Sequence, residues 1–238
     1  MKYIYKSLEF SQQNLGLLLL FIIINSIPLT VTTGESTHNQ DFVINSILSL
    51  ITNIISLFLI SGAYSIIWNK FKNNPVNFSL LIPESKKYFC NFLGVSIAIA
   101  ILGFLMIVVC NLFYKYFFYQ NVEAVTSYTT EQAISIVRIS FFLVLAIFCY
   151  AIPYLYVKKI NSKRAFLSAP KILIKYMNQS IPIIILLIIN WLIIFSLPYS
   201  HSSSWDITTL VQIIIYYIQF HIFVATCQIL NELDISNL

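Results

Sequence analysis

His221 has the clearest capacity for acid–base chemistry in this sequence. It lies inside a long apolar segment, and the imidazole is the side chain that titrates near neutral pH. An ionisable residue in such a segment is a functional candidate, because a charge in a low-dielectric medium is costly. None of the apolar segments contains Asp or Glu as a partner. A neutral histidine, hydrogen-bonded to a neighbouring helix, is therefore the alternative interpretation.

The segment around His221, residues 207–228, is the most polar of the apolar segments. At 100° per residue, four polar side chains share one face of a helix and three share the opposite face. The first face holds Gln212, Tyr216, Gln219 and Thr226, and the second holds Tyr217, His221 and Gln228. Two polar faces predict a helix that is surrounded by protein rather than by lipid.

A second set of small polar residues follows one face of the segment 42–68. These residues are Asn45, Ser49, Thr52, Asn53 and Ser56. Two interpretations fit: small and hydroxyl side chains allow close helix packing with hydrogen bonds across the contact, or they line a hydrated pathway. Together with Gln212, Tyr216, Gln219 and His221, these five residues form the candidate intramembrane polar site.

Sequence signatures of catalysis and metal binding are absent. There is no H-E-x-x-H, no G-x-G-x-x-G, no phosphate-binding G-K-[ST] and no acidic pair within an apolar segment. None of the four cysteines, Cys90, Cys110, Cys149 and Cys227, forms a C-x-x-C pair, so we interpret them as inert thiols. The sequence therefore predicts a protein that is not an enzyme, with no catalytic residue, cofactor or metal site.

The composition indicates which elements must position these side chains. Of the 238 residues, 58% are hydrophobic, 16% aromatic and 10% charged. Soluble domains are about 45–50% apolar and about 25% charged. These values argue against a soluble enzyme, a disordered chain and a nucleic-acid-binding domain, and they favour a protein that crosses a membrane several times.

Six segments reach the length of about 20 mostly apolar residues that a spanning helix needs. They are 15–31, 42–68, 91–114, 139–157, 181–197 and 207–228. Their apolar runs are continuous rather than alternating, which predicts an all-α membrane bundle forming one domain over 1–238. We interpret the first segment as a retained helix; a secretory signal is the alternative, although no A-x-A-like site follows it. Pro153 predicts a kink near the end of the fourth segment.

Basic residues are distributed very unevenly among the connections. Twelve of the 14 Lys and Arg residues precede the first segment or lie in the loops after the second and fourth segments. Because such residues accumulate on the cytoplasmic side, we expect both termini in the cytoplasm, in a cell membrane of bacterial type. Each basic residue near an anionic leaflet contributes about 1 kcal/mol of attraction. The expected partners are thus the bilayer and its anionic headgroups rather than nucleic acid.

The stretches before the third and fifth segments resemble each other. In both, a proline is followed by an asparagine eight positions later, Pro83 to Asn91 and Pro170 to Asn178, and a lysine adjoins a tyrosine. The N-terminal YKSLEFSQQN has the same amphipathic character. One interpretation is three helical hairpins, each introduced by a short interfacial helix. The other is that stretches beside membranes are generally rich in lysine and aromatic residues.

This arrangement resembles the six-helix bacterial membrane proteins of the YciC-like kind and the membrane domain of some glycerophosphoryl diester phosphodiesterases. The resemblance rests on IYKSLEFSQQNLGLLLLFII, on SGAYSIIWNKFKNNPVNFSLLIPESKKYF with Gly62, and on KKINSKRAFLSAPKILIKYMNQ with its Ala165 and Ser168. It implies an architecture rather than an activity, and the phosphodiesterase catalytic domain is not in this chain.

The function expected from these observations is non-enzymatic and concerns membrane homeostasis or lipid handling. The alternative is a membrane-spanning permease subunit that works with a separate cytoplasmic ATPase, which would bind the stretches 78–88 and 165–176. A bacteriocin-immunity protein fits the size, but no specific residue supports it.

Overall fold

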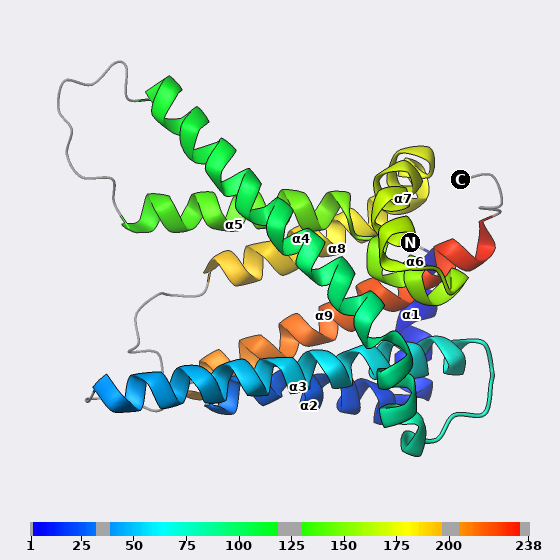
Figure 1. The fold of residues 1–238 in the computed structure, drawn as a ribbon. Coiled ribbons are helices and arrows are strands. Elements are labelled where there is room, and N and C mark those ends of the chain that lie inside the picture. Colours follow the sequence, from blue (N-terminus) through cyan, green and yellow to red (C-terminus); the bar gives the residue numbers. More distant parts are fainter. Residues whose placement is uncertain (1, 32–38, 119–129, 197–204, 234–238) are drawn as a thin grey trace.

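The computed structural model describes residues 2–31, 39–118, 130–196 and 205–233, with side chains for 2–27, 46–113, 116, 135–194 and 209–233. Throughout these ranges, the regular structure is helical (Figure 1). The elements are α1 (Lys2–Gln13), α2 (Leu15–Val31), α3 (Asn39–Phe71), the short 3₁₀ helix η1 (Phe78–Leu80), α4 (Leu81–Phe118), α5 (Thr130–Ile147), α6 (Ala151–Lys158), α7 (Ser162–Lys175), α8 (Met177–Ser196) and α9 (Trp205–Glu232). The predicted all-α class is confirmed.

Several of these helices are long and apolar enough to cross a membrane. Among the described residues, five stretches meet this condition, and α1 with α2 forms a sixth candidate that is bent by 94°. The five are Ser46–Phe71, Phe78–Phe113, Ser135–Lys158, Met177–Ile194 and Thr209–Glu232. Helices suit this environment because they satisfy their backbone hydrogen bonds internally. The chain is a membrane protein, and its consecutive long helices pack as α2 with α3, α3 with α4, α4 with α5, and α8 with α9.

The kink that Pro153 predicts is present as a break between α5 and α6. Helix α5 ends at Ile147, and α6 begins at Ala151, so Pro153 lies in the first turn of α6. Proline has no backbone N–H and its ring clashes with the carbonyl four residues earlier, which here belongs to Cys149. The first turn of a new helix accommodates both effects.

Short amphipathic helices introduce the first and third hairpins. Helix α1 meets α2 at 94°, and the Asn14 side chain at the bend donates to the carbonyl of Phe10 (2.9 Å). Helix α7 precedes α8 and is capped by Asn161, whose side chain accepts from the amide of Arg164 (2.9 Å). The second hairpin differs from the expected pattern, because the residues after η1 continue into α4. Pro83 is the third residue of α4, where a missing N–H breaks no intrahelical bond.

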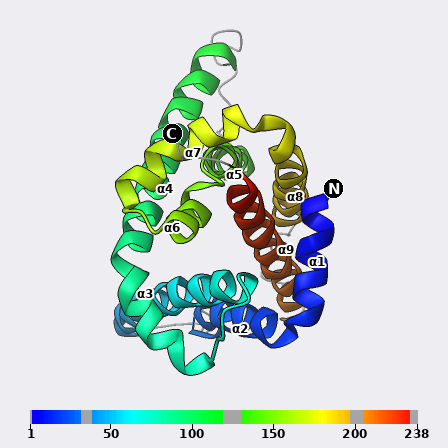
Figure 2. The same ribbon diagram turned by 90° about the vertical axis from the view of Figure 1, so that its right-hand side faces the viewer.

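The core of the bundle lies around α6 and the C-terminal half of α9. Seen along the bundle in Figure 2, α6 and α9 lie inside the outline formed by α1, α2, α3, α4, α7 and α8. Residues 221–230 of α9 are all buried, which agrees with the prediction that protein surrounds this helix. Its apolar stretch is 61% buried, against 17% for that of α4. The outer helices therefore expose apolar side chains on the surface of the bundle, and the C-terminal half of α9 packs them against the protein.

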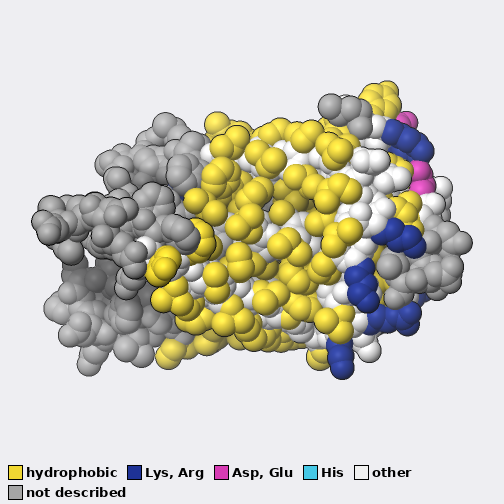
Figure 3. Space-filling view, turned by 90° about the horizontal axis from the view of Figure 1, so that it is seen from above, with side chains coloured by type: hydrophobic (Ala, Val, Ile, Leu, Met, Phe, Trp, Pro, Cys, Tyr) yellow, Lys and Arg dark blue, Asp and Glu magenta, His cyan; other side chains and the backbone are white. Residues whose placement is uncertain are grey.

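The basic side chains gather at one end of this apolar bundle. Figure 3 shows a broad hydrophobic surface with Lys and Arg at its right-hand end, where α1, the end of α3, the start of α4 and α7 meet. All twelve basic residues that the sequence places in these connections are exposed. We call this region the basic end. Its members are Lys2, Lys6, Lys70, Lys72, Lys86, Lys87, Lys158, Lys159, Lys163, Arg164, Lys171 and Lys175.

Candidate functional site

The polar face of α3 bonds mainly to its own helix away from the basic end. Thr52 Oγ1 donates to the carbonyl of Leu48 (2.7 Å), and Asn53 Nδ2 donates to the carbonyl of Ser49 (2.8 Å) and to Ser49 Oγ (3.3 Å). These bonds span one helical turn, so each side chain is satisfied without a neighbouring helix or water. The side chain of Asn45 lies outside the described residues.

Ser56 is the member of this face that joins two helices. Its hydroxyl is buried and donates to the carbonyl of Ile24 on α2 (3.0 Å). This is the close packing with a hydrogen bond across the contact that small polar residues allow between membrane helices. At Ser56 the geometry is that of packing between α2 and α3.

On α9, the predicted polar residues separate into two environments. Gln212 Nε2 donates to the hydroxyl of Tyr216 (3.3 Å) one turn away, and Gln219 is half-buried. His221 is buried on the opposite side, and its Nδ1 lies 3.2 Å from the hydroxyl oxygen of Ser7 on α1. No hydrogen bond between the described side chains joins the polar face of α3 to these residues of α9. These hydrogen bonds therefore do not join the described members of the candidate polar site on the two helices.

The His221–Ser7 contact fixes the hydrogen-bonding roles of both side chains. Ser7 Oγ donates its single proton to the carbonyl of Ile4 (2.8 Å). The imidazole Nδ1 must then be the donor toward Ser7 Oγ, and Nε2 carries no proton in the neutral ring. The Ser7 hydroxyl thus donates one hydrogen bond and accepts another, and the His221–Ser7 pair links α1 to the centre of α9.

A polar junction that the sequence analysis did not identify lies where α3, α4 and α6 meet near the basic end. The hydroxyl of Ser65 donates to the carboxylate of Glu84, and the hydroxyl of Tyr156 donates to the carbonyl of Ser61 (2.9 Å). Ser61 Oγ donates to the carbonyl of Phe58 (2.7 Å) and lies 3.5 Å from that of Ser85. The signal in the sequence was the stretch Ser61–Ser65, which places a glycine between small polar residues.

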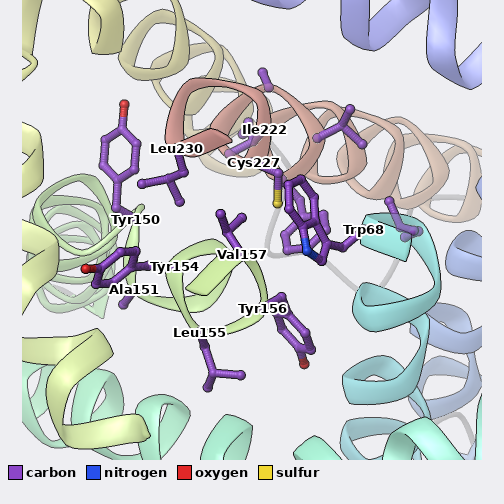
Figure 4. Close-up of a cluster of buried hydrophobic side chains, with 14 of the residues drawn as sticks. Trp68, Tyr150, Ala151, Tyr154, Leu155, Tyr156, Val157, Ile222, Cys227 and Leu230 are labelled. Carbon is purple, nitrogen blue, oxygen red and sulfur yellow. The ribbon is translucent and has the colours of Figure 1, made fainter. Parts of the chain in front are cut away.

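Aromatic rings pack against the polar junction on the side that faces the core of the bundle. The ring centroids of Tyr64 and Phe223 are 4.2 Å apart, and those of Tyr88 and Tyr156 are 4.9 Å apart. Figure 4 shows Tyr156 and Trp68 among the buried side chains around α6. The junction contains one carboxylate, hydroxyls and carbonyls, and among the described residues no three His, Cys, Asp or Glu side chains come together to hold a metal ion. Its chemistry is suited to joining helices.

Lysines at the basic end lie over neighbouring aromatic rings. The Nζ atom of Lys72 is 4.7 Å from the ring centroid of Trp68, that of Lys87 is 5.1 Å from Tyr88, and that of Lys175 is 5.5 Å from Tyr176. Such cation–π contacts place an ammonium beside an aromatic ring that prefers the boundary between water and hydrocarbon. The arrangement is suited to the headgroup region of a bilayer.

At the basic end, Glu232 joins the end of α9 to α1. Lys2 Nζ and the Tyr3 hydroxyl donate to its Oε2 (2.9 and 3.1 Å), and Lys6 Nζ donates to its Oε1 (3.0 Å). The hydrogen bond to Glu232, together with the attraction of that carboxylate, holds the pKa of Lys2 above its ordinary value. Lys2 and Lys6 thus each form an ion pair with Glu232 on α9.

The fold and its apolar helices define the class of this molecule, an α-helical multi-pass membrane protein. No protein family, curated protein or solved structure matches the chain.

Proposed function

We propose that this chain is a non-enzymatic protein of a bacterial cell membrane that handles anionic lipids at its cytoplasmic face. The observation that carries the proposal is the basic end, whose twelve Lys and Arg side chains are exposed. Figure 3 shows Lys and Arg side chains beside the apolar surface of the bundle. The described side chains at this end include three carboxylates, Glu9, Glu84 and Glu232. The excess positive charge attracts an anionic leaflet. The short helices α1 and α7, which precede the first and third hairpins, also support a relationship to the YciC-like proteins.

Helix α7 is the part of the basic end best suited to lying in a bilayer interface. Its buried face, which includes Ala165 and Ile172, packs on the protein, while Lys163, Arg164 and Lys171 are exposed. Leu167 and Ile174 are exposed between these charges, at 57% and 72% of their surface. Apolar and basic side chains on one exposed face are typical of a helix that lies among anionic headgroups.

The orientation proposed here places the basic end in the cytoplasm. In a cysteine-free background, an Asn74→Cys variant in the exposed loop after α3 should react with a membrane-impermeant maleimide only after cells are permeabilised. A Ser203→Cys variant, between the last two predicted spans, should react on intact cells. The reverse pattern would contradict the orientation, because it would place the basic loops outside.

The function is tested by the lipids that remain with the purified protein. After extraction in mild detergent, mass spectrometry should find phosphatidylglycerol or cardiolipin enriched over phosphatidylethanolamine relative to the membrane. Neutralising α7 with Lys163→Gln, Arg164→Gln and Lys171→Gln should reduce the enrichment severalfold, since each basic residue contributes about 1 kcal/mol. Lys115→Gln, at the far end of α4, is the control and should leave the enrichment unchanged.

Equal lipid ratios in the protein and the membrane would refute the proposal. The same purification tests the second candidate, a permease subunit with a cytoplasmic ATPase. The exposed Leu167 and Ile174 on α7 favour it, because apolar side chains on a short helix outside the bundle can also bind a protein. An ATPase recovered in stoichiometric amount would establish this candidate in place of the first.

A further inference from the structure

A small cavity opens at the basic end, beside the bend between α1 and α2. Its volume is about 200 Å³, and its lining residues are Asn14, Gly16, Leu17, Lys70, Val76 and Phe78. A water molecule occupies about 30 Å³ of liquid, so the cavity holds a group several times larger. Three separate parts of the chain form it: the bend, the last turn of α3, and the stretch that leads into η1.

The polar side of the cavity is suited to an anion. Lys70 is exposed in the last turn of α3, and no described carboxylate lies within 4.0 Å of its ammonium. Asn14 Nδ2 donates one hydrogen bond, to Phe10 (2.9 Å), and a side-chain amide carries two N–H groups. The lining therefore offers a positive charge and an amide donor, and it contains no acidic residue.

The other side of the cavity is apolar. Leu17 is buried, Val76 is half-buried, and Phe78 is held on η1, whose first turn is capped by the Asn77 side chain. The Phe78 ring lies over Gly16, because a Cβ atom on this glycine would be 3.7 Å from Phe78 Cζ. A ligand that enters here thus meets cationic and hydrocarbon groups within a few ångströms of each other.

We infer that this cavity binds the phosphate of an anionic phospholipid, with Lys70 and Asn14 on the phosphate and Leu17, Val76 and Phe78 against the glycerol and the first acyl carbons. The inference deepens the proposed function and rests on it, since it assigns one defined lipid site within the basic end. The position supports a lipid, because the cavity lies at the ends of the apolar helices α2 and α3, beside Lys70. A soluble phosphate compound carries the same phosphate group as the lipid headgroup. The test therefore compares soluble phosphates with the lipid.

The test measures binding to the delipidated full-length protein in a neutral detergent by native mass spectrometry. The probes are phosphatidylglycerol, phosphatidylcholine, glycerol 3-phosphate and inorganic phosphate. We expect one saturable phosphatidylglycerol per protein. Lys70→Gln should weaken it about tenfold or more, as the loss of a hydrogen bond to a charged group does. Lys72→Gln is the matched control, because it removes an equal charge two residues away and Lys72 does not line the cavity.

A second variant tests the cavity without changing any charge. Gly16→Leu places a side chain under the Phe78 ring and should abolish the saturable binding, while the melting temperature in detergent shows that the protein is folded. Equal affinities for the wild type, Lys70→Gln and Gly16→Leu would overturn the inference. If that result comes with lipid enrichment that still depends on α7, the proposed function stands and only this site fails.

The soluble probes decide the source of the phosphate. Binding of phosphatidylglycerol that glycerol 3-phosphate does not displace at millimolar concentration supports the lipid site. Binding of glycerol 3-phosphate or inorganic phosphate as tight as that of the lipid, and equally dependent on Lys70, overturns the lipid assignment and makes the cavity a site for a soluble phosphate.

Discussion

The Gly62→Ala variant is expected to lose about 2–3 kcal/mol of stability, although it adds only one methyl group. A Cβ atom at this position would lie 2.5 Å from the backbone carbonyl oxygen of Leu81 and 3.0 Å from the amide nitrogen of Ser85, and it would overlap the Ser85 hydroxyl. Two of these atoms belong to the backbone of α4, so no change of rotamer relieves the contact. Helix α4 must move away from α3, which weakens the polar junction between them.

The measurement is unfolding by increasing fractions of SDS in mixed micelles, followed by circular dichroism. Gly16→Ala is the control, because a Cβ atom there makes only an ordinary contact of 3.7 Å with Phe78. It should unfold at the same SDS fraction as the wild type or a higher one, since alanine favours a helix over glycine. If Gly62→Ala and Gly16→Ala unfold together, the tight α3–α4 contact is not a determinant of stability.

Removing the side chain of Tyr156 should have the largest effect of any truncation in the core, about 3–5 kcal/mol for Tyr156→Ala. This side chain is fully buried on α6 (Figure 4). Its ring lies within 6.0 Å of the rings of Tyr64, Tyr88 and Phe223, and its hydroxyl donates to Ser61. The truncation therefore leaves a cavity at the point where α3, α4, α6 and α9 meet.

The same unfolding assay separates the ring from the hydroxyl. Tyr156→Phe keeps the packing and loses one hydrogen bond, so it should cost about 1 kcal/mol. A Tyr156→Ala loss no larger than that of Tyr156→Phe would show that the bundle closes around the vacated space. It would also show that α6 does not organise the core.

The elements of this fold were predictable from the sequence because membrane helices satisfy their own backbone hydrogen bonds. The first predicted span, residues 15–31, has the same bounds as α2. Pro153 marked the break between α5 and α6 because the effect of proline is local. The bend after residue 13 and the start of α7 also follow from short-range features, the side chains of Asn14 and Asn161.

The contacts between helices were not predictable in the same way. The segment that carries the predicted polar face is helical, as expected. Thr52 and Asn53 on that face nevertheless donate hydrogen bonds to carbonyls of α3 itself. The junction lies one to two turns further on, where Ser65 meets a glutamate that the sequence assigned to a loop. Which helix faces which depends on shape and packing over the whole bundle, and one sequence does not display these.

The cavity beside Lys70 was missed for a related reason. Asn14 and Lys70 are far apart in the chain, and the packing of α2 against α3 brings the first turn of α2 beside the end of α3. Neither residue has an unusual neighbour in the sequence. Lysine at the end of a membrane helix is expected for topology alone.

The burial of α9 has a consequence for biogenesis. Chains are synthesised from the N-terminus, so the helices that enclose α9 leave the ribosome before it does. Until it inserts, Tyr64 lacks Phe223, Ser7 lacks His221, and Lys2 and Lys6 lack Glu232. A chain truncated before α9 would expose these inward surfaces to lipid and to membrane proteases, so the preceding helices depend on α9 for their inward contacts.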